Sequence, residues 1–412
     1  MAIGEALRER TRVMVSALEV PNYRLLFAGR VTSNAGRTMR VFARALWVLE
    51  ATGSPLRMGI AVSALSWPML FMPLVGGIVA DRVDRKTLLL WTEGLLVALW
   101  GIVAFLITLG LFEWWYFIIS AVTSGTIQSF GRAGHQAMIG SVVDDKRLGN
   151  AVALDSISMT WPRIAAPALG GVLIGHIGVG GLFWLTAAGQ LVTFITLLFI
   201  HWTPQEQRAA KESVGDNILE VIRHVRGETV IMSLVTLGLF SSLFAGSFNF
   251  LLPIFAVEIL DAGEQGLGVL MTSAALGAAL GSVLVLAASN ARRHRGLLLI
   301  AMAILKTTML IIFSQSNLLP LSVVAMFGLG GAQIIFMTTV TMAMQQLAPD
   351  HLRGRIMSLR VIVMGFSPFG VIVMGVIAEV RGAADTVLIS GILYGISALI
   401  LFAVVPTLRR FQ

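Results

Sequence analysis

The stretch HWTPQEQRAAKESVGDNILEVIRHVRGET, residues 201–229, is the longest polar stretch of the chain and divides it close to its middle. Six apolar segments precede it and six follow it, and each is long enough to cross a hydrocarbon layer of roughly 30 Å as a helix. Their expected bounds are 22–50, 57–80, 87–111, 114–138, 151–175, 181–202, 228–258, 265–289, 296–315, 318–346, 355–379 and 384–406. The sequence therefore predicts an all-α integral membrane protein of twelve transmembrane helices, arranged as an internal six-plus-six repeat.

The composition supports a membrane protein and excludes several other classes. Of the 412 residues, 56% are hydrophobic and 13% are charged, whereas an average soluble domain is about 25% charged. The absence of cysteine excludes disulfides, thiolate catalysis and cysteine metal sites. We find no phosphate-binding loop, nucleophile triad or metal-ligand cluster, so we expect no enzyme activity, no cofactor and no metal.

The basic residues indicate the orientation in the membrane. Nearly all loop arginines and lysines fall on one side of the predicted topology, and only Arg57 and Arg381 lie clearly opposite. By the positive-inside rule, both termini and the linker 203–227 are cytoplasmic in a bacterial-type inner membrane. The net charge of +8 therefore predicts loop anchoring rather than nucleic-acid binding. Within the linker, one apolar face predicts an amphipathic helix on the membrane surface, formed by Ile218, Leu219, Val221, Ile222 and Val225.

Two motifs carry a resemblance to a known family. GGIVADRVDRK, residues 76–86, resembles the GxxxDRxGRR loop of the major facilitator superfamily, with Asp84 in place of the usual second glycine. WPRIAAPALGGVLIG, in the fifth predicted span, resembles the GPxxGG motif of the superfamily's exporters. NYRLLFAGR, FGRAGHQAMIGSVV and APDHLRGRIMSLRVIVMGFSPFG are similar to the branch of the enterobactin exporter and related drug and macrolide efflux proteins. The resemblance covers nearly the whole chain.

The resemblance implies a fold, a set of domains and a gate. Two six-helix bundles, 1–202 and 228–412, would rock about a central cavity and open it alternately to each side. The gate residues that it implies are Gly77, Asp81, Arg82, Arg85, Lys86, Arg353 and Arg355. Helix flexure would come from Pro167, Gly170 and Gly171, although such residues are common in any membrane helix.

The first predicted span carries an arginine stripe. Arg30, Arg37 and Arg44 are spaced by seven residues and share one helix face, with Arg40 close to it. In the resembling family the position of Arg37 usually carries an acid. Arginine stays protonated and can bind an anion through paired hydrogen bonds. The alternative is internal pairing with Glu93, Asp155 and Glu258, but Arg132, Arg163 and Lys306 add further positive charge.

The predicted sites follow from these intramembrane polar groups, which are functional candidates by default. For substrate binding we expect Asn34, Arg37, Arg44, Gln128 and Asn249. For proton coupling the candidates are Glu93, Asp155 and His135, because buried carboxylates and imidazoles can change protonation near physiological pH.

The function that these features predict is secondary active export of a small organic molecule by alternating access, with proton antiport as in drug or metabolite efflux. One alternative is a dedicated exporter of an anionic metabolite or siderophore. Another is a membrane sensor or scaffold that keeps the fold without transport. The expected partners are a small-molecule substrate, protons and the lipid bilayer, with the protein acting as a monomer.

Overall fold

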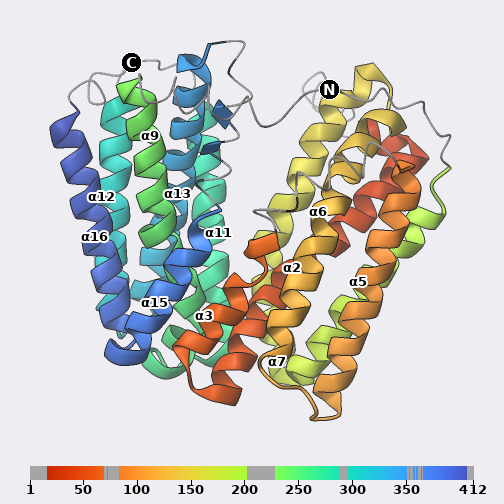
Figure 1. The fold of residues 1–412 in the computed structure, drawn as a ribbon, viewed down its shortest axis with the longest axis horizontal. Helices are drawn as coiled ribbons and strands as arrows, with labels where there is room; N and C mark the ends of the chain where they lie inside the picture. Colours follow the sequence, from red (N-terminus) through yellow and green to blue (C-terminus); the bar gives the residue numbers. More distant parts are fainter. Residues whose placement is uncertain are drawn as a thin grey trace, which may run out of the picture. The chain divides into compact units, whose positions relative to one another are not determined.

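The computed structural model describes residues 16–68, 72, 83–201, 228–287, 295–349, 352, 356, 357, 359, 360, 363 and 365–405. The regular elements of these residues are all helical (Figure 1). They are η1 (Ser16–Glu19), α2 (Pro21–Thr52), α3 (Pro55–Ser63), α5 (Arg85–Thr108), α6 (Tyr116–Val142), α7 (Asp145–Leu198), α9 (Thr229–Phe240), η2 (Ser241–Ala245), η3 (Ser247–Leu251), α10 (Leu252–Ile254), η4 (Phe255–Ile259), α11 (Gly263–Ala287), α12 (Arg295–Ser314), α13 (Leu319–Leu347), α15 (Ser367–Arg381) and α16 (Ala383–Val404).

The described residues fall into two compact units. The first unit takes those up to Arg44 and those from Ala64 to His201. The second takes Ala45–Ser63 and those from Glu228 onward. The second half of α2 and the whole of α3 therefore pack with the second unit. There, Glu379 of α15 accepts hydrogen bonds from Ser54 Oγ at 2.8 Å and from Leu56 N at 3.1 Å.

In the first unit, α5 packs against α6 and α7. Helix α7 contains a break at Gly178, whose φ of 67° and ψ of 176° are not helical. A left-handed φ is favourable for glycine, which has no Cβ. The break at Gly178 separates two helical stretches, at the place where the sequence predicts a turn between residues 175 and 181. Trp100, Phe117 and Phe183 form an aromatic core in which each side chain is almost completely buried.

In the second unit, α11 and α13 approach each other closely. A Cβ added to Gly277 would lie 1.9 Å from the Phe327 carbonyl oxygen, and one added to Gly330 would lie 1.8 Å from that of Ala274. Glycine at these positions therefore lets the two backbones touch, as small residues do between membrane helices. Helix α12 packs against α13 and α16.

The segment Thr229–Ile259 is a helix of mixed type. It begins as α9, passes through the π-helical turn η2 and the 3₁₀ turn η3, and ends through α10 in a second π-helical turn, η4. Single π-helical turns are frequent at functional sites.

Seven helices of the described residues are long and apolar enough to cross a membrane. They include α5, α7, Thr229–Ile259 and α16. Helix α2 is 32 residues long but is not one of them, because arginines interrupt its apolar sequence. The arrangement of twelve helices, with domain bounds 1–202, 203–227 and 228–412, stays a prediction.

Candidate functional site

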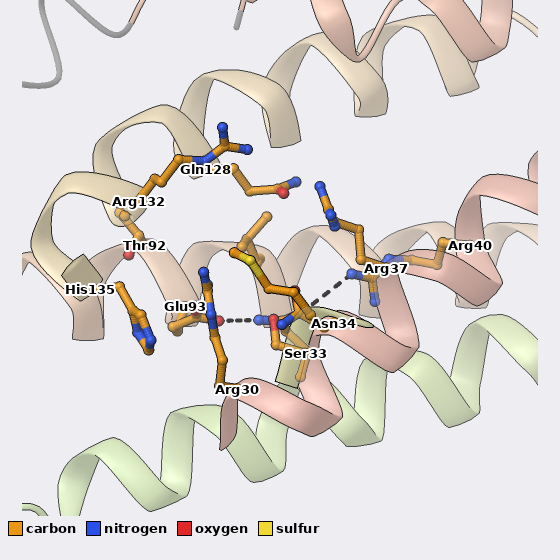
Figure 2. A pocket seen from close by; sticks show the side chains of 14 residues that line it. Arg30, Ser33, Asn34, Arg37, Arg40, Thr92, Glu93, Gln128, Arg132 and His135 are labelled. Atoms are coloured by element: carbon orange, nitrogen blue, oxygen red, sulfur yellow. Dashed lines mark hydrogen bonds between the residues drawn. The ribbon is translucent and has the colours of Figure 1, made fainter. Parts of the chain in front are cut away.

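The first unit contains a cavity that is partly open to its surroundings (Figure 2). Four helices build its wall. The lining residues are Arg30, Ser33, Asn34, Arg37 and Arg40 of α2, Thr92, Glu93 and Leu96 of α5, Gln128, Gly131, Arg132 and His135 of α6, and Met159 and Gln190 of α7. The spacing of three and four residues on α2 and α6 places each set on one helix face.

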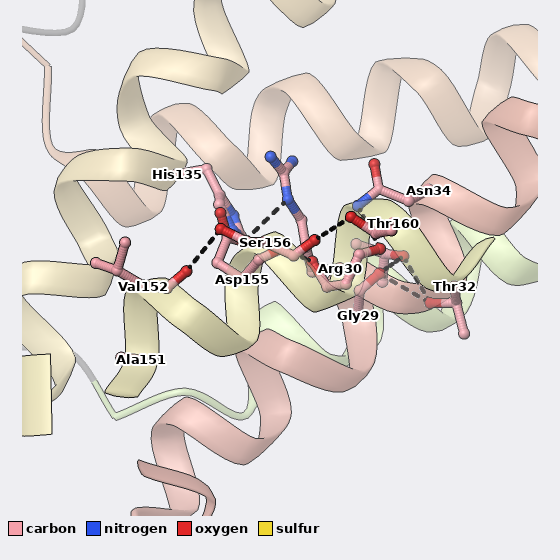
Figure 3. A network of polar contacts seen from close by, with 12 residues as sticks. Gly29, Arg30, Thr32, Asn34, His135, Ala151, Val152, Asp155, Ser156 and Thr160 are labelled. Atoms are coloured by element: carbon pink, nitrogen blue, oxygen red, sulfur yellow. Dashed lines mark hydrogen bonds and ion pairs between the residues drawn. The ribbon is translucent and has the colours of Figure 1, made fainter. Parts of the chain in front are cut away.

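Asp155 brings together two basic groups beside this cavity (Figure 3). Its Oδ1 lies 3.5 Å from Arg30 Nε and 3.5 Å from His135 Nε2. The carboxylate belongs to α7, the arginine to α2 and the histidine to α6, so the cluster joins three helices. The single carboxylate offsets the charge of Arg30, and a protonated His135 would leave the cluster with one net positive charge.

A second network holds Arg40. Its Nη1 donates to the Thr186 carbonyl and its Nη2 to Gln190 Oε1, both at 3.4 Å. The Gln190 amide in turn donates to Glu93 Oε2, so Gln190 bridges the acid and the guanidinium. Arg40 Cζ also lies 4.5 Å from the centroid of the Trp100 ring. The arginine is 4% exposed and has the partners that a buried charge requires.

Arg44 is placed against aromatic rings rather than at the cavity wall. It is 2% exposed, and its Cζ lies 6.0 Å from the Trp100 centroid and 5.6 Å from that of Phe117. It is not one of the residues that line the cavity. The stripe predicted from the spacing of seven is present, but its last member points into the protein core.

Arg37 and Arg132 differ from the other cavity arginines. Within the described part of the chain, neither makes a hydrogen bond or an ion pair. Arg37 lies close enough to Arg132, Arg163 and Arg30 to interact with them electrostatically. The cavity therefore presents two guanidinium groups with free donors and repulsion between them, and an anion would relieve that repulsion.

The predicted polar substrate residues have separate places. Asn34 and Gln128 line the cavity, and the Asn34 amide donates to the Ser158 carbonyl at 3.1 Å. Asn249 belongs to η3 of the second unit, where it is exposed and donates to the Gly246 carbonyl at 2.9 Å. The cavity thus includes Asn34, Arg37 and Gln128 of the five predicted binding residues.

Of the predicted gate residues, the described part of the structure includes Arg85 and Lys86. Gly77, Asp81, Arg82, Arg353 and Arg355 lie outside the described residues. Asp84, the departure from the motif, caps α5, since its Oδ1 accepts a hydrogen bond from Thr87 N at 2.9 Å.

The basic end of the motif holds neighbouring helices of the same unit. Arg85 donates to Ser141 Oγ at 2.8 Å. Lys86 Nζ donates to the carbonyls of Leu198 and Ile200, at 3.1 and 2.8 Å. It thereby caps the carboxyl end of α7, where a cation is favourable.

The glycine-proline motif of α7 also has a packing role. Pro167 lies inside the helix, and Gly171 is buried. A Cβ added to Gly170 would lie 2.4 Å from Phe42 Cε1. Gly170 therefore allows close contact between α7 and the ring on α2.

Two features of the site were not predicted from the sequence. These are the bridging role of Gln190 and the stacking of Trp100 on Arg40. Both partners are far from Arg40 in the chain, so helical spacing gives no signal for them. Among the described residues, no three His, Asp or Glu side chains come together as metal ligands would.

Comparison with known proteins identifies relatives over nearly the whole chain. Residues 14–410 match the family described as "Transmembrane secretion effector". The enterobactin exporter EntS of Citrobacter koseri is 24% identical over 396 residues, which cover 95% of this chain and 94% of that protein. The multidrug efflux pump Tap of Mycolicibacterium fortuitum is 23% identical over 412 residues, 97% of this chain and 99% of that protein.

Two further matches bear on length and fold. An uncharacterized MFS-type transporter of Bacillus subtilis is 23% identical over 202 residues, which are 47% of this chain and 47% of that protein. The crystal structure of the nucleoside transporter NupG superposes with a TM-score of 0.76 at 14% identity, over 95% of this chain and 100% of that one. At this identity the likeness shows the fold alone.

Proposed function

Because the chain belongs to the transmembrane secretion effector family of the major facilitator superfamily, whose members are transporters and not enzymes, we propose that it exports a small organic molecule by alternating access. The chain is a multi-pass membrane protein with exporters among its relatives. Its proposed location is a bacterial-type inner membrane with cytoplasmic termini, where it works as a monomer of twelve helices in two bundles.

The observation that carries the proposal is the cavity that Arg37 and Arg132 line without acidic partners in the described structure. An exporter needs a polar site at membrane depth that a substrate can complete. Arg40 and Arg30 have partners of their own, so Arg37 and Arg132 are left to bind cargo. Asn34 and Gln128 on the same wall add amide groups that can orient it.

The proposed energy source is the proton gradient, with Glu93 as the leading proton carrier. Glu93 lines the cavity and receives a hydrogen bond from Gln190, with no ion pair to a basic group in the described residues. Asp155 has two basic neighbours, and its protonation would leave Arg30 without an acid. His135 is a second carrier through its contact with Asp155.

Proton binding at Glu93 would act on the rest of the network. A neutral Glu93 weakens its bond with Gln190, which also accepts a hydrogen bond from Arg40. The helices α2, α5 and α7 meet in this network, so a proton can change how they pack. The gate proposed from the motif, formed by Asp81, Arg82 and Arg85 with Arg353 and Arg355, would complete the cycle.

The experiment is transport by the purified protein in liposomes, with a panel of anionic, neutral and cationic organic compounds. Thermal stability in detergent selects compounds first, because a ligand of the folded state raises its stability by mass action. The proposal predicts accumulation of a stabilising compound driven by an imposed pH gradient. A protein that binds a compound but never moves it would instead be a sensor or scaffold.

A second candidate is a dedicated exporter of an anionic metabolite or siderophore. The free guanidinium groups of Arg37 and Arg132 favour it over broad drug efflux, and one relative is named for enterobactin export. Stabilisation confined to the anionic compounds supports this candidate. Stabilisation by lipophilic cations contradicts it and favours drug efflux.

A further inference from the structure

Lys306, near the middle of α12, is buried inside the second unit. Its side chain is 1% exposed. Nζ donates to Ser241 Oγ at 2.7 Å and lies 4.5 Å from the ring centroid of Tyr394 and 5.1 Å from that of Phe336. All three neighbours are completely buried, so the amine is enclosed by one hydroxyl group and two aromatic faces.

No carboxylate faces this amine from the elements packed against α12. These are α13, α16 and η2, together with η3 and η4, whose Phe248 and Phe255 contact Phe313 of α12. Glu258 is the acid of η4, and its side chain is exposed rather than turned toward the buried amine. Neither α13 nor η2 contains a charged or titratable residue, and α16 contains Asp385 and Tyr394. Asp385 precedes Tyr394 by nine residues, which is roughly 13 Å along a helix. Within the described residues Lys306 makes no ion pair.

A charged lysine in such a place is costly. Burial of an ammonium group without an acid costs several kcal/mol, and the aromatic faces with one hydrogen bond return only part of it. The neutral amine fits the same space and can accept the hydroxyl hydrogen of Ser241. Both the charged and the neutral amine can therefore form a hydrogen bond with Ser241. No acidic side chain among the described residues favours the charged form over the neutral one.

The site also lies where a membrane helix changes from α-helical to π-helical hydrogen bonding. Ser241 is the first residue of the π-helical turn η2, and Ser390 of α16 donates to the Phe244 carbonyl of the same turn at 2.6 Å. A cavity begins one turn away, lined by Gly238, Met337 and Arg360 among others. Single π-helical turns inside helices are frequently found at functional sites.

We propose that Lys306 is a further proton-binding site, in the second unit, which takes up H⁺ as an ammonium group when the helix opens at η2 and releases it when the aromatic enclosure closes. The reaction is the addition of one proton to the Nζ lone pair, with no other co-reactant. Ser241 changes from donor to acceptor as the proton arrives, so the turn η2 responds to it. The inference rests on the proposed proton-driven export and places part of the coupling in the second unit.

The first test measures protonation directly and needs no transport. The chain has four lysines, Lys86, Lys146, Lys211 and Lys306, so ε-¹³C-lysine labelling gives few NMR signals. The signal that Lys306→Arg removes belongs to Lys306. We expect it to move between the positions of a neutral and a charged amine within the pH range over which the protein stays folded. A signal that holds one protonation state over that range overturns the proposal.

The second test is transport in liposomes. We expect Lys306→Gln and Lys306→Arg to reduce accumulation driven by a pH gradient by about tenfold or more, because neither side chain exchanges a proton at this site. Substrate exchange at equal pH should continue, since it needs no net proton movement. Thr308→Ala, an exposed position on the same helix, is the matched control and should behave as the parent.

The two tests separate the possible failures. If Lys306→Gln keeps the parent's response to the pH gradient, the lysine is a packing residue and the proposal is wrong. If the parent itself shows no proton-driven transport, the proposed coupling fails, whereas the NMR titration still decides whether Lys306 binds a proton. If Lys306→Gln does not fold, the test uses transport by Lys306→Arg and the NMR titration of the unsubstituted protein.

Discussion

The guanidinium group of Arg40 lies over the indole ring of Trp100, with Cζ 4.5 Å from the ring centroid. Together with the hydrogen bonds to Thr186 and Gln190, this contact accounts for a charge that is almost completely buried. The arginines of α2 therefore differ in their surroundings. Arg40 is held by the protein, whereas Arg37, one turn earlier, faces the cavity without a partner in the described structure.

Arg40→Ala is expected to lower the thermal unfolding midpoint of the detergent-purified protein clearly. Hydrogen bonds to a charged group contribute about 1.5–3 kcal/mol each, and the substitution leaves the Thr186 carbonyl and the Gln190 amide oxygen without their donor. Arg24→Ala, at an exposed position of the same helix, should leave the midpoint nearly unchanged. Equal midpoints for the two variants would show that the contacts of Arg40, its hydrogen bonds and its contact with Trp100 together, add nothing to stability.

Arg37→Ala is expected to weaken binding of a stabilising anion by about 10- to 100-fold, since hydrogen bonds to a charged group contribute about 1.5–3 kcal/mol. The ligand-free midpoint should not fall, because Arg37 has no bonded partner to lose. Titration of the thermal shift with the anion measures the change, with Arg24→Ala as control. Unchanged anion affinity would remove Arg37 from the proposed site.

Glu93→Gln imitates a permanently protonated side chain and is expected to abolish accumulation driven by a pH gradient. Binding of substrate and exchange at equal pH should remain, because the amide keeps a hydrogen bond with Gln190. Glu113→Gln, on an exposed turn between α5 and α6, is the matched control in the same liposome assay. Normal gradient-driven accumulation by Glu93→Gln would assign the coupling to another group.

Gly170→Ala is expected to destabilise the protein by about 1–3 kcal/mol, as overpacking does, because its methyl group would overlap the Phe42 ring. Gly175→Ala on the same helix has nothing within 4 Å of the added Cβ and should be neutral. The thermal unfolding midpoints of the two detergent-purified variants measure the difference in stability. Adding Phe42→Leu to Gly170→Ala should restore part of the loss, and a failure to do so would place the strain elsewhere.

Much of the local structure follows from local sequence. Asp84 begins α5 because its carboxylate caps the Thr87 amide, and Gly178 breaks α7 because it takes a left-handed φ. The π-helical turns in Thr229–Ile259 are not visible in the sequence. The first of them, η2, receives hydrogen bonds from Lys306 of α12 and Ser390 of α16, and such partners distant in the chain leave no local signal.

The sequence by itself determined that the chain is helical, apolar enough for a membrane and related to exporters, because hydropathy and short motifs are properties of contiguous residues. It also placed Arg30, Arg37, Arg40 and Arg44 close together on one helix, since helical spacing is local. Which groups contact each of these arginines was decided only by tertiary structure. The partners Asp155, Gln190 and Trp100 come from other helices, and only packing brings their atoms within bonding distance.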